Sequence, residues 1–324
     1  MKKILGIGNA LVDIMTRIED DFFLETIGLP KGSMQLVDNT FVEKLHIQIE
    51  SLQKSISAGG SAANTINGLA NLGVETGFIG VVGNDNMGEY FANDMIKNGI
   101  TPHLYKSPNK SGVATAFVSP DSERTFATFL GAALELTEAH LDESVLKNYD
   151  IIHIEGYLVQ NYDLIKSIMA KAKSCGLKVS LDLASYNVVE ANLELLKNLV
   201  EEYVDIVFAN EEEAKAFTGE EPHEALIVIS ESCEIGVVKI GPKGSLIKAK
   251  ENLHTVGVIT ANCIDTTGAG DMYAAGFLYG YVNNLPLEIC GKIGAILAGH
   301  VIQVVGSKIE ESTWAQIKEL IKSA

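Results

Sequence analysis

The sequence has few cysteines and few positive charges relative to negative ones. Its four cysteines form no CxxC pair and have no neighbouring histidines, which excludes a structural zinc site and favours a reducing compartment. With 25 Lys and Arg against 42 Asp and Glu, the formal net charge of −17 argues against a nucleic-acid backbone as the main partner. A local nest of amide groups can still bind a small anion in an acidic protein.

Long hydrophobic runs are also missing, although 47% of the residues are hydrophobic and can form a large core. The apolar run near the N-terminus is broken by Asn9 and Asp13, so we expect no signal peptide. The apolar segment 293–305 is interrupted by His300 and Gln303 and is shorter than a membrane span. We therefore expect a cytoplasmic protein with neither a membrane nor a nucleic acid as partner.

Two common nucleotide-binding motifs are absent or incomplete. The P-loop pattern GxxxxGK[ST] occurs nowhere in the chain. The pair Gly6-x-Gly8 begins a dinucleotide fingerprint, but Leu11 stands where its third glycine belongs. This disfavours an NAD(P)-dependent oxidoreductase, an alternative that a test of NAD(P)H binding would close.

The most informative stretch is 265–281, where Gly268, Ala269 and Gly270 precede Asp271 and an apolar helix. The first amide groups of a helix have no partners within it, and the macrodipole adds about half a positive charge there. The segment is therefore predicted to bind a phosphate or a developing oxyanion. Asp271 in the first turn either complements the helix dipole or accepts a proton from an attacking hydroxyl. The residues alone leave both interpretations open.

Strand and helix patterns alternate along most of the chain. Short apolar runs predict buried parallel strands, and helical segments separate several of them; the runs are 4–8, 151–154, 178–181 and 206–208. Two irregular stretches, about 14–45 and 101–131, interrupt the alternation, and the second contains an expected hairpin. We predict one α/β domain over residues 1–324, with a mostly parallel central sheet and a small discontinuous β-lid formed by these stretches.

Several polar residues and glycines occupy positions suited to a ligand. Asp13 follows the first predicted strand, where an open α/β sheet has its ligand crevice, and is either a sugar-binding residue or a loop cap. Gly59 and Gly60 permit close backbone approach ahead of a helix in which Asn64 could bind a sugar diol. Glu213, in an acidic cluster that opens a helix, either complements the helix dipole or holds hydrated Mg²⁺.

In their order along the chain, these segments resemble the PfkB/ribokinase family of carbohydrate kinases. The resemblance covers essentially the whole chain and is carried by Gly59-Gly60-x-x-x-Asn64, Asn210-x-x-Glu213, Gly241-x-x-Gly244 and Asp265-Thr266-x-Gly268-Ala269-Gly270-Asp271. Within the family, the adenosine kinases are the most similar, through segments 8–14, 21–24, 31–35 and 155–158.

The resemblance implies a ribokinase-like three-layer α/β fold with a β-lid. It also implies transfer of the γ-phosphoryl group of ATP, with Mg²⁺, to a primary hydroxyl of a sugar or nucleoside, with the 5′-hydroxyl of adenosine as the best candidate. A ribokinase-like or fructokinase-like sugar kinase is the alternative, followed by a non-catalytic nucleoside or sugar sensor. The expected assembly is a monomer or a homodimer formed through the lid.

The resemblance further implies roles for individual residues. Asp271 matches the catalytic base, and the amides of Gly268, Ala269 and Gly270 match the anion hole. Substrate-binding positions are matched by Asn9, Asp13, Gln35, Gly59, Gly60 and Asn64. ATP-binding positions are matched by Asn210, Lys239, Gly241, Gly244, Gly268 and Gly270, with Lys239 standing where many relatives have threonine.

The resemblance also implies positions for ions. Glu213 matches a position that holds Mg²⁺ through water, and Asp265 and Thr267 match positions that bind a monovalent cation such as K⁺ in several relatives. Arg124, near the expected hairpin turn, either covers the phosphates when the lid closes or is simply a solvated turn residue.

Overall fold

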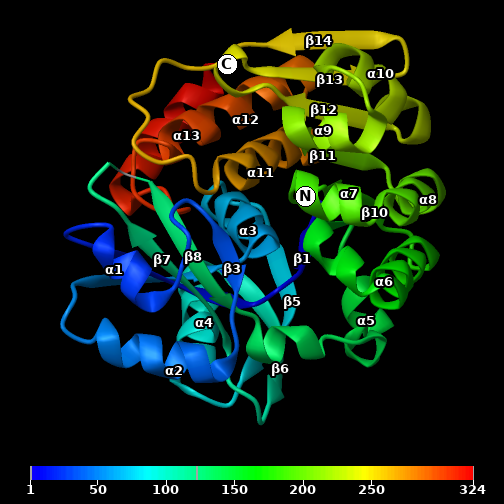
Figure 1. Ribbon diagram of the computed structural model, residues 1–324. Coiled ribbons are helices and arrows are strands. Elements are labelled where there is room, and N and C mark those ends of the chain that lie inside the picture. Colours follow the sequence, from blue (N-terminus) through cyan, green and yellow to red (C-terminus); the bar gives the residue numbers. More distant parts are fainter. Residues whose placement is uncertain (1, 122, 324) are drawn as a thin grey trace.

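Two β-sheets organise the computed structural model, which describes residues 2–121 and 123–323 (Figure 1). The larger sheet has nine strands within these residues, in the order β14-β13-β12-β11-β10-β9-β1-β5-β6. They are β1 (Ile4–Ile7), β5 (Thr76–Gly83), β6 (Ile100–Ser107), β9 (Ile151–Glu155), β10 (Lys178–Asp182), β11 (Ile206–Asn210), β12 (Ile235–Lys239), β13 (Ser245–Ala249) and β14 (Asn252–Val256). The mostly parallel sheet predicted from the sequence is confirmed.

Parallel pairing runs from β6 to β12, and only β13 and β14 pair antiparallel to their neighbours. Every residue of β1 and β5 is buried. A parallel sheet has helices on both faces, so its strands carry continuous apolar runs instead of alternating patterns.

Helices cover both faces and make the three layers that the fold prediction required (Figure 1). One face packs against α3 (Ser61–Asn71), α4 (Asn86–Lys97), α11 (Ala269–Val282), α12 (Leu287–Val301) and α13 (Trp314–Lys322). The other packs against α5 (Glu143–Leu146), α6 (Tyr162–Ser174), α7 (Tyr186–Ala191), α8 (Leu193–Tyr203), α9 (Glu211–Thr218) and α10 (Pro222–Ser232). Short 3₁₀ helices span Gly131–Glu135, Glu138–His140, Gly156–Gln160, Gly241–Lys243 and Glu311–Thr313. In the described part of the chain, no helix has both the length and the apolar character needed to cross a bilayer.

In the part of the chain that the structure describes, the smaller sheet has five strands in the order β3-β8-β7-β2-β4. They are β2 (Leu11–Arg17), β3 (Met34–Leu36), β4 (Lys54–Gly59), β7 (Gly112–Val118) and β8 (Arg124–Phe129). Helices α1 (Phe22–Ile27) and α2 (Asn39–Gln48) pack against this sheet through a separate apolar cluster that includes Leu24, Leu45 and Phe117. The expected hairpin is confirmed as β7 and β8, which pair antiparallel.

The boundaries expected for the lid differ from this second sheet in two places. Residues 101–107, assigned to the lid from the sequence, belong to β6 at the edge of the larger sheet. Conversely, β4 at 54–59 pairs antiparallel with β2 and was not expected in the lid. Neither strand contains a continuous apolar run that would predict it from the sequence. Strand β6 is only partly buried because it lies at the edge of the sheet, and β4 begins with polar, exposed residues.

Candidate functional site

Polar side chains gather where the parallel strands of the larger sheet end. Asn9 follows β1, and the last residues of four neighbouring strands are Glu155 in β9, Asp182 in β10, Asn210 in β11 and Lys239 in β12. The carboxyl edge of an open α/β sheet is where ligands bind in this architecture. Asp182 and Glu155 were not singled out as site residues from the sequence, although an acid that ends an apolar strand is a usable signal.

The turn before α11 has the geometry of an anion cradle. Gly268 caps the helix in the left-handed region at φ 75°, and a Cβ there would lie 2.7 Å from the Cβ of Ser307. A Cβ on Gly270 would lie 3.0 Å from Nζ of Lys239. The amide of Ala269 donates to the carbonyl oxygen of Thr266 at 3.1 Å, which leaves the amides of Gly268 and Gly270 as the available donors of the cradle. The Lys239 ammonium group stands beside Gly270, and it favours an anion together with these amides.

Asp271, in the first turn of α11, is held by two residues from the start of α3. Oγ of Ser61 donates to its Oδ1 at 2.7 Å, and Nδ2 of Asn64 donates to its Oδ2 at 2.9 Å. Oγ of Ser307 in turn donates to Oδ1 of Asn64 at 3.1 Å, which orients the amide. The structure thus brings together the predicted residues Asn64 and Asp271 beside the cradle.

The protonation of Asp271 is set mainly by its surroundings. Burial raises the pKa of Asp271 to about 6, while the hydrogen bonds from Asn64 and Ser61 act in the opposite direction. The negative charge of Asp182 raises this pKa further, and the positive charge of Lys239 lowers it. Near neutral pH the carboxylate is ionised and able to accept a proton, with a pKa closer to that of an effective general base.

Asp13 lies on β2 of the second sheet, so the loop-cap interpretation is wrong for this residue. It is half-buried, and burial raises its pKa to about 7, against the positive charge of Lys308. A Cβ at Gly59 would overlap the Asp13 carboxylate and displace it from its observed position. Gly60 has φ 98°, and a Cβ there would overlap the carbonyl oxygen of Asn9. These predicted residues therefore form one tightly packed group.

Glu155 connects this group to α3. Its Oε1 accepts hydrogen bonds from N and Nδ2 of Asn9 at 2.8 and 2.6 Å, and its Oε2 accepts one from N of Ala62 at 3.1 Å. Burial raises the pKa of Glu155 to about 7 despite these bonds. The side chain thus fixes the end of β1 against the start of the helix that carries Asn64.

Asn210 and Glu213 form a capping box at the start of α9. Glu213 accepts from N and Nδ2 of Asn210 at 2.8 and 2.7 Å, and Oδ1 of Asn210 accepts from N of Glu213 at 2.8 Å. Burial and the nearby charge of Asp182 raise the pKa of Glu213 to about 7. These contacts place the Glu213 carboxylate at the N-terminus of α9, where it also complements the helix dipole. Among residues 2–121 and 123–323, no three His, Cys, Asp or Glu side chains are grouped as metal ligands.

Lys239 forms an ion pair with Asp182, at 3.0 Å between Nζ and Oδ2, and only 15% of its side chain is exposed. Gly241 and Gly244 follow it in the turn between β12 and β13, with φ values of 55° and 101°. Gly244 admits no side chain because a Cβ would overlap the carbonyl oxygen of Val256. The turn is thus built around these glycines, next to the strand end that carries Lys239.

Gln35 is not brought to this group. It is exposed on the edge strand β3 and pairs in register with Ala127, which is buried in the cluster under α1 and α2. The registers through β7 and β2 align Ala127 with Ile14, so alternation puts Gln35 on the face opposite Asp13. The prediction of a substrate-binding Gln35 is therefore not supported by its position.

Asp265 and Thr267 precede the cradle and are tied to the second sheet. Oδ1 of Asp265 accepts from N of Thr267 at 2.6 Å, and Oδ2 accepts from N of Gly306 at 2.6 Å. Arg124 of β8 forms an ion pair with Oδ1 of Asp265 and donates from Nη1 to Oγ1 of Thr267 at 2.8 Å. Arg124 is therefore neither a solvated turn residue nor free to cover a phosphate in this conformation.

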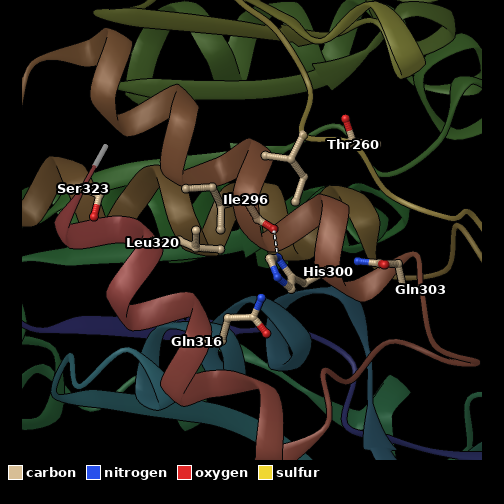
Figure 2. A pocket seen from close by; sticks show the side chains of 8 residues that line it. Thr260, Ile296, His300, Gln303, Gln316, Leu320 and Ser323 are labelled. Atoms are coloured by element: carbon tan, nitrogen blue, oxygen red, sulfur yellow. Dashed lines mark hydrogen bonds between the residues drawn. The ribbon is translucent and has the colours of Figure 1, made fainter.

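A cavity of about 500 Å³ opens between α12, α13 and the connection that leads to Asp265 (Figure 2). It is lined by Ile259, Thr260, Ile296, His300, Gln303, Gln316, Leu320 and Ser323. The backbone of α12 at Ile293 packs against Gly276 of α11, and Ser307 contacts Gly268. This antiparallel packing puts the C-terminal half of α12, and with it the cavity, at the cradle end of α11.

Known proteins resemble this chain over most of its length. The family model for pfkB family carbohydrate kinases matches residues 35–314. An adenosine kinase structure from Sinorhizobium meliloti is 33% identical, with a TM-score of 0.88 over 98% of this chain and 99% of that one. A nucleoside kinase from Methanocaldococcus jannaschii is 30% identical over 85% of this chain and 88% of its own length. A 5-dehydro-2-deoxygluconokinase from Geobacillus kaustophilus is 30% identical over 82% of this chain and 84% of its own length.

Proposed function

Because this chain belongs to the pfkB family of carbohydrate kinases, we propose that it transfers the γ-phosphoryl group of ATP to the 5′-hydroxyl of a nucleoside, with adenosine as the first candidate. Family membership makes the protein a phosphotransferase for a sugar or a nucleoside. The observation that carries the proposal is the Asp271 carboxylate, held by Asn64 and Ser61 in the first turn of α11 beside the amides of the cradle.

In the proposed reaction, the oxygen of the acceptor hydroxyl forms a bond to the γ-phosphorus of ATP, and Asp271 accepts the proton of that hydroxyl. The bond between the γ-phosphorus and the oxygen of the β-phosphate breaks, and ADP leaves. Phosphoryl transfer needs in-line placement and charge neutralisation more than a strong base. The amides of Gly268 and Gly270 and the ammonium group of Lys239 would stabilise the charge on the transferring group. The amide of Ala269 would join them only after it gives up its hydrogen bond to Thr266.

The proposed ATP site runs from the cradle towards the cavity beside α12. The free amides and Lys239 supply donors for the phosphates, and the cavity offers both apolar walls and polar groups to an adenine base. Mg²⁺, when bound, would supply positive charge that neutralises the phosphates. Both Glu213 oxygens accept hydrogen bonds from Asn210, and we propose that Glu213 would hold the ion through water, since Mg²⁺ keeps several of its waters.

The proposed acceptor site lies between Asp13 and Asn64, and its second-sheet wall is apolar. Alternation puts Met15 on the same face as Asp13. The strand registers put Met34, Leu36 and Phe126 on this face as well. Met34 and Leu36 are 52% and 58% exposed, which leaves apolar surface free for a flat base. The similarity to an adenosine kinase and to a nucleoside kinase supports the same choice.

A sugar kinase is the second candidate. The similarity to a 5-dehydro-2-deoxygluconokinase favours it, and the Asp13 carboxylate and Asn64 amide could hold the hydroxyls of a free sugar equally well. A ribokinase-like or fructokinase-like enzyme would use the same catalytic groups, so only the acceptor distinguishes these functions. The third candidate, a non-catalytic sensor, would bind the acceptor without consuming ATP.

A substrate screen with ATP and Mg²⁺ tests the proposal. Adenosine, inosine, guanosine, ribose, fructose and fructose phosphates are compared by coupled ADP release, with Asp271→Asn as the blank. We expect the highest kcat/KM with adenosine and none above background in the variant. Preference for a free sugar would move the assignment to the second candidate, and acceptor binding without turnover would favour the sensor.

A further inference from the structure

The Asp265 carboxylate is fully buried and close to the cradle, so its negative charge needs a partner. The Asp265 side chain has no exposed surface, and the neighbouring Arg124 side chain is 13% exposed. An unpaired carboxylate in such a place would be strongly destabilised by desolvation. The guanidinium group of Arg124 supplies the compensating charge.

Both carboxylate oxygens of Asp265 accept from donors of this chain. Oδ1 faces Arg124 and N of Thr267, while Oδ2 accepts from N of Gly306. Oγ1 of Thr267 also accepts from Arg124, at 2.8 Å. A bound K⁺ at this place would need these oxygens and would lie against the guanidinium, with electrostatic repulsion between two cations.

The described residues therefore do not fit the monovalent cation that the family resemblance implies at Asp265 and Thr267. We propose that Arg124 takes the place of this cation, so that the segment 265–267 is ordered by a guanidinium of the second sheet and needs no K⁺. The positive charge reaches Asp265 from β8, whereas Asp265 and the cradle belong to the connection before α11. Arg124 is then a positioning residue. It acts on the cradle through Asp265, which binds the amide of Thr267 directly before Gly268.

This role predicts that K⁺ stabilises the protein only after the charge of Arg124 is removed. Arg124→Met keeps the apolar stem and deletes the charge, and the matched control is Arg17→Met, which changes the only other arginine, exposed on the second sheet. The melting temperature is measured in KCl and in tetramethylammonium chloride of equal ionic strength. This readout does not depend on the proposed kinase reaction, on which the inference otherwise rests.

We expect the wild-type protein and Arg17→Met to melt at the same temperature in both salts. Arg124→Met should melt at least about 4 °C lower in tetramethylammonium and recover part of the loss in KCl alone. With ATP and the best acceptor from the screen, kcat of this variant should fall at least about tenfold and rise again with K⁺, as expected for a lost charge-assisted contact. Arg124→Lys keeps one positive charge, so its melting temperature and kcat should fall less than those of Arg124→Met and should change less when K⁺ is added.

Two results would overturn the inference. The first is a wild-type protein that K⁺ stabilises more than tetramethylammonium, which would mean that a cation site exists beside Arg124. The second is an Arg124→Met protein that shows a raised KM for ATP and no response to K⁺, which would assign Arg124 to the phosphates. If Arg124→Met does not fold, the wild-type comparison and Arg124→Lys still decide the question. Absence of kinase activity with K⁺-independent melting would count against the proposed function alone.

Discussion

Nδ2 of Asn64 donates a 2.9 Å hydrogen bond to Oδ2 of Asp271, across 207 residues of sequence. The bond joins the first turns of α3 and α11, so the helix that begins at the anion cradle is aligned with the helix beside Asp13. It also stabilises the ionised form of Asp271, because the amide nitrogen can only donate. This contact thus helps to position the proposed base and opposes the rise that burial causes in its pKa.

The pH dependence of catalysis should report this bond. Since the pKa of Asp271 is raised to about 6, kcat/KM should fall as the pH drops through about 6, where the carboxylate gains its proton. Asn64→Ala removes a bond that lowers this pKa, so its acid limb should move to higher pH. Measurement of kcat/KM for the wild type and for Asn64→Ala between pH 5 and 9 tests this. If the acid limb of the Asn64→Ala profile moved to lower pH, the assignment of Asp271 as the base would be contradicted.

Asp13→Asn should stabilise the protein while it weakens acceptor binding. The folded-state pKa of Asp13 is raised from 3.8 to about 7, so the proton is held in the folded state and the stabilising contribution is lost as the pH rises through about 7. At pH 8 we expect the free energy of unfolding to increase by about 2 kcal/mol, less than the full shift implies because the side chain is half-buried.

The difference between Asp13→Asn and wild type should shrink as the pH is lowered towards 4, which urea unfolding at several pH values will show. The KM for the acceptor should rise at least about tenfold with the KM for ATP unchanged, since a charged hydrogen-bond partner is lost only on the acceptor side. A protein destabilised at pH 8 would contradict the electrostatic account of this carboxylate.

Lys239→Met should raise the KM for ATP by about tenfold to a hundredfold, the range for losing a charged hydrogen-bond partner. Its ammonium group stands beside Gly270, and the substitution also leaves Asp182 without its ion-pair partner. Lys292→Met, which removes an exposed lysine paired with Glu288, is the matched control. It should change neither the KM for ATP nor the KM for the acceptor. Steady-state kinetics over ATP concentration decide; an unchanged KM for ATP would remove Lys239 from the phosphate site.

The cavity beside α12 can be tested by filling it. Thr260 is exposed at its rim, so Thr260→Trp should reduce the space without disturbing the core, and Thr255→Trp on β14 serves as an exposed control. We expect the KM for ATP to rise at least about fivefold, corresponding to a steric cost of about 1 kcal/mol. Equal KM values for ATP in both variants would move the base of ATP out of this cavity.

The sequence predicts the parallel sheet because buried parallel strands such as β1 are continuous apolar runs. It predicts Asp271 and Asn64 because each lies at a glycine-rich helix start. It fails for β4, whose exposed polar residues hide its pairing with β2, and for Gln35, whose facing depends on a strand register that no local pattern specifies. Glu155 and Asp182 each end a predicted apolar strand, which is a usable signal, but their contacts with Asn9 and Lys239 depend on how distant segments pack.

The Arg124–Asp265 pair was beyond sequence reasoning for the same reason. Arg124 stands in an ordinary hairpin sequence, and nothing local indicates that β8 reaches the segment before α11. Long-range pairs of this kind depend on how two sheets pack, which the spacing of residues in one segment does not encode.

The most direct test is the turnover of Asp271→Asn with ATP and the best acceptor, with ATP affinity measured on the same protein by calorimetry. The account predicts that kcat falls at least about a hundredfold, as for loss of a general base, while ATP binding stays within about twofold of wild type. Turnover near the wild-type rate would contradict it, because the carboxylate beside the cradle would then have no part in the transfer.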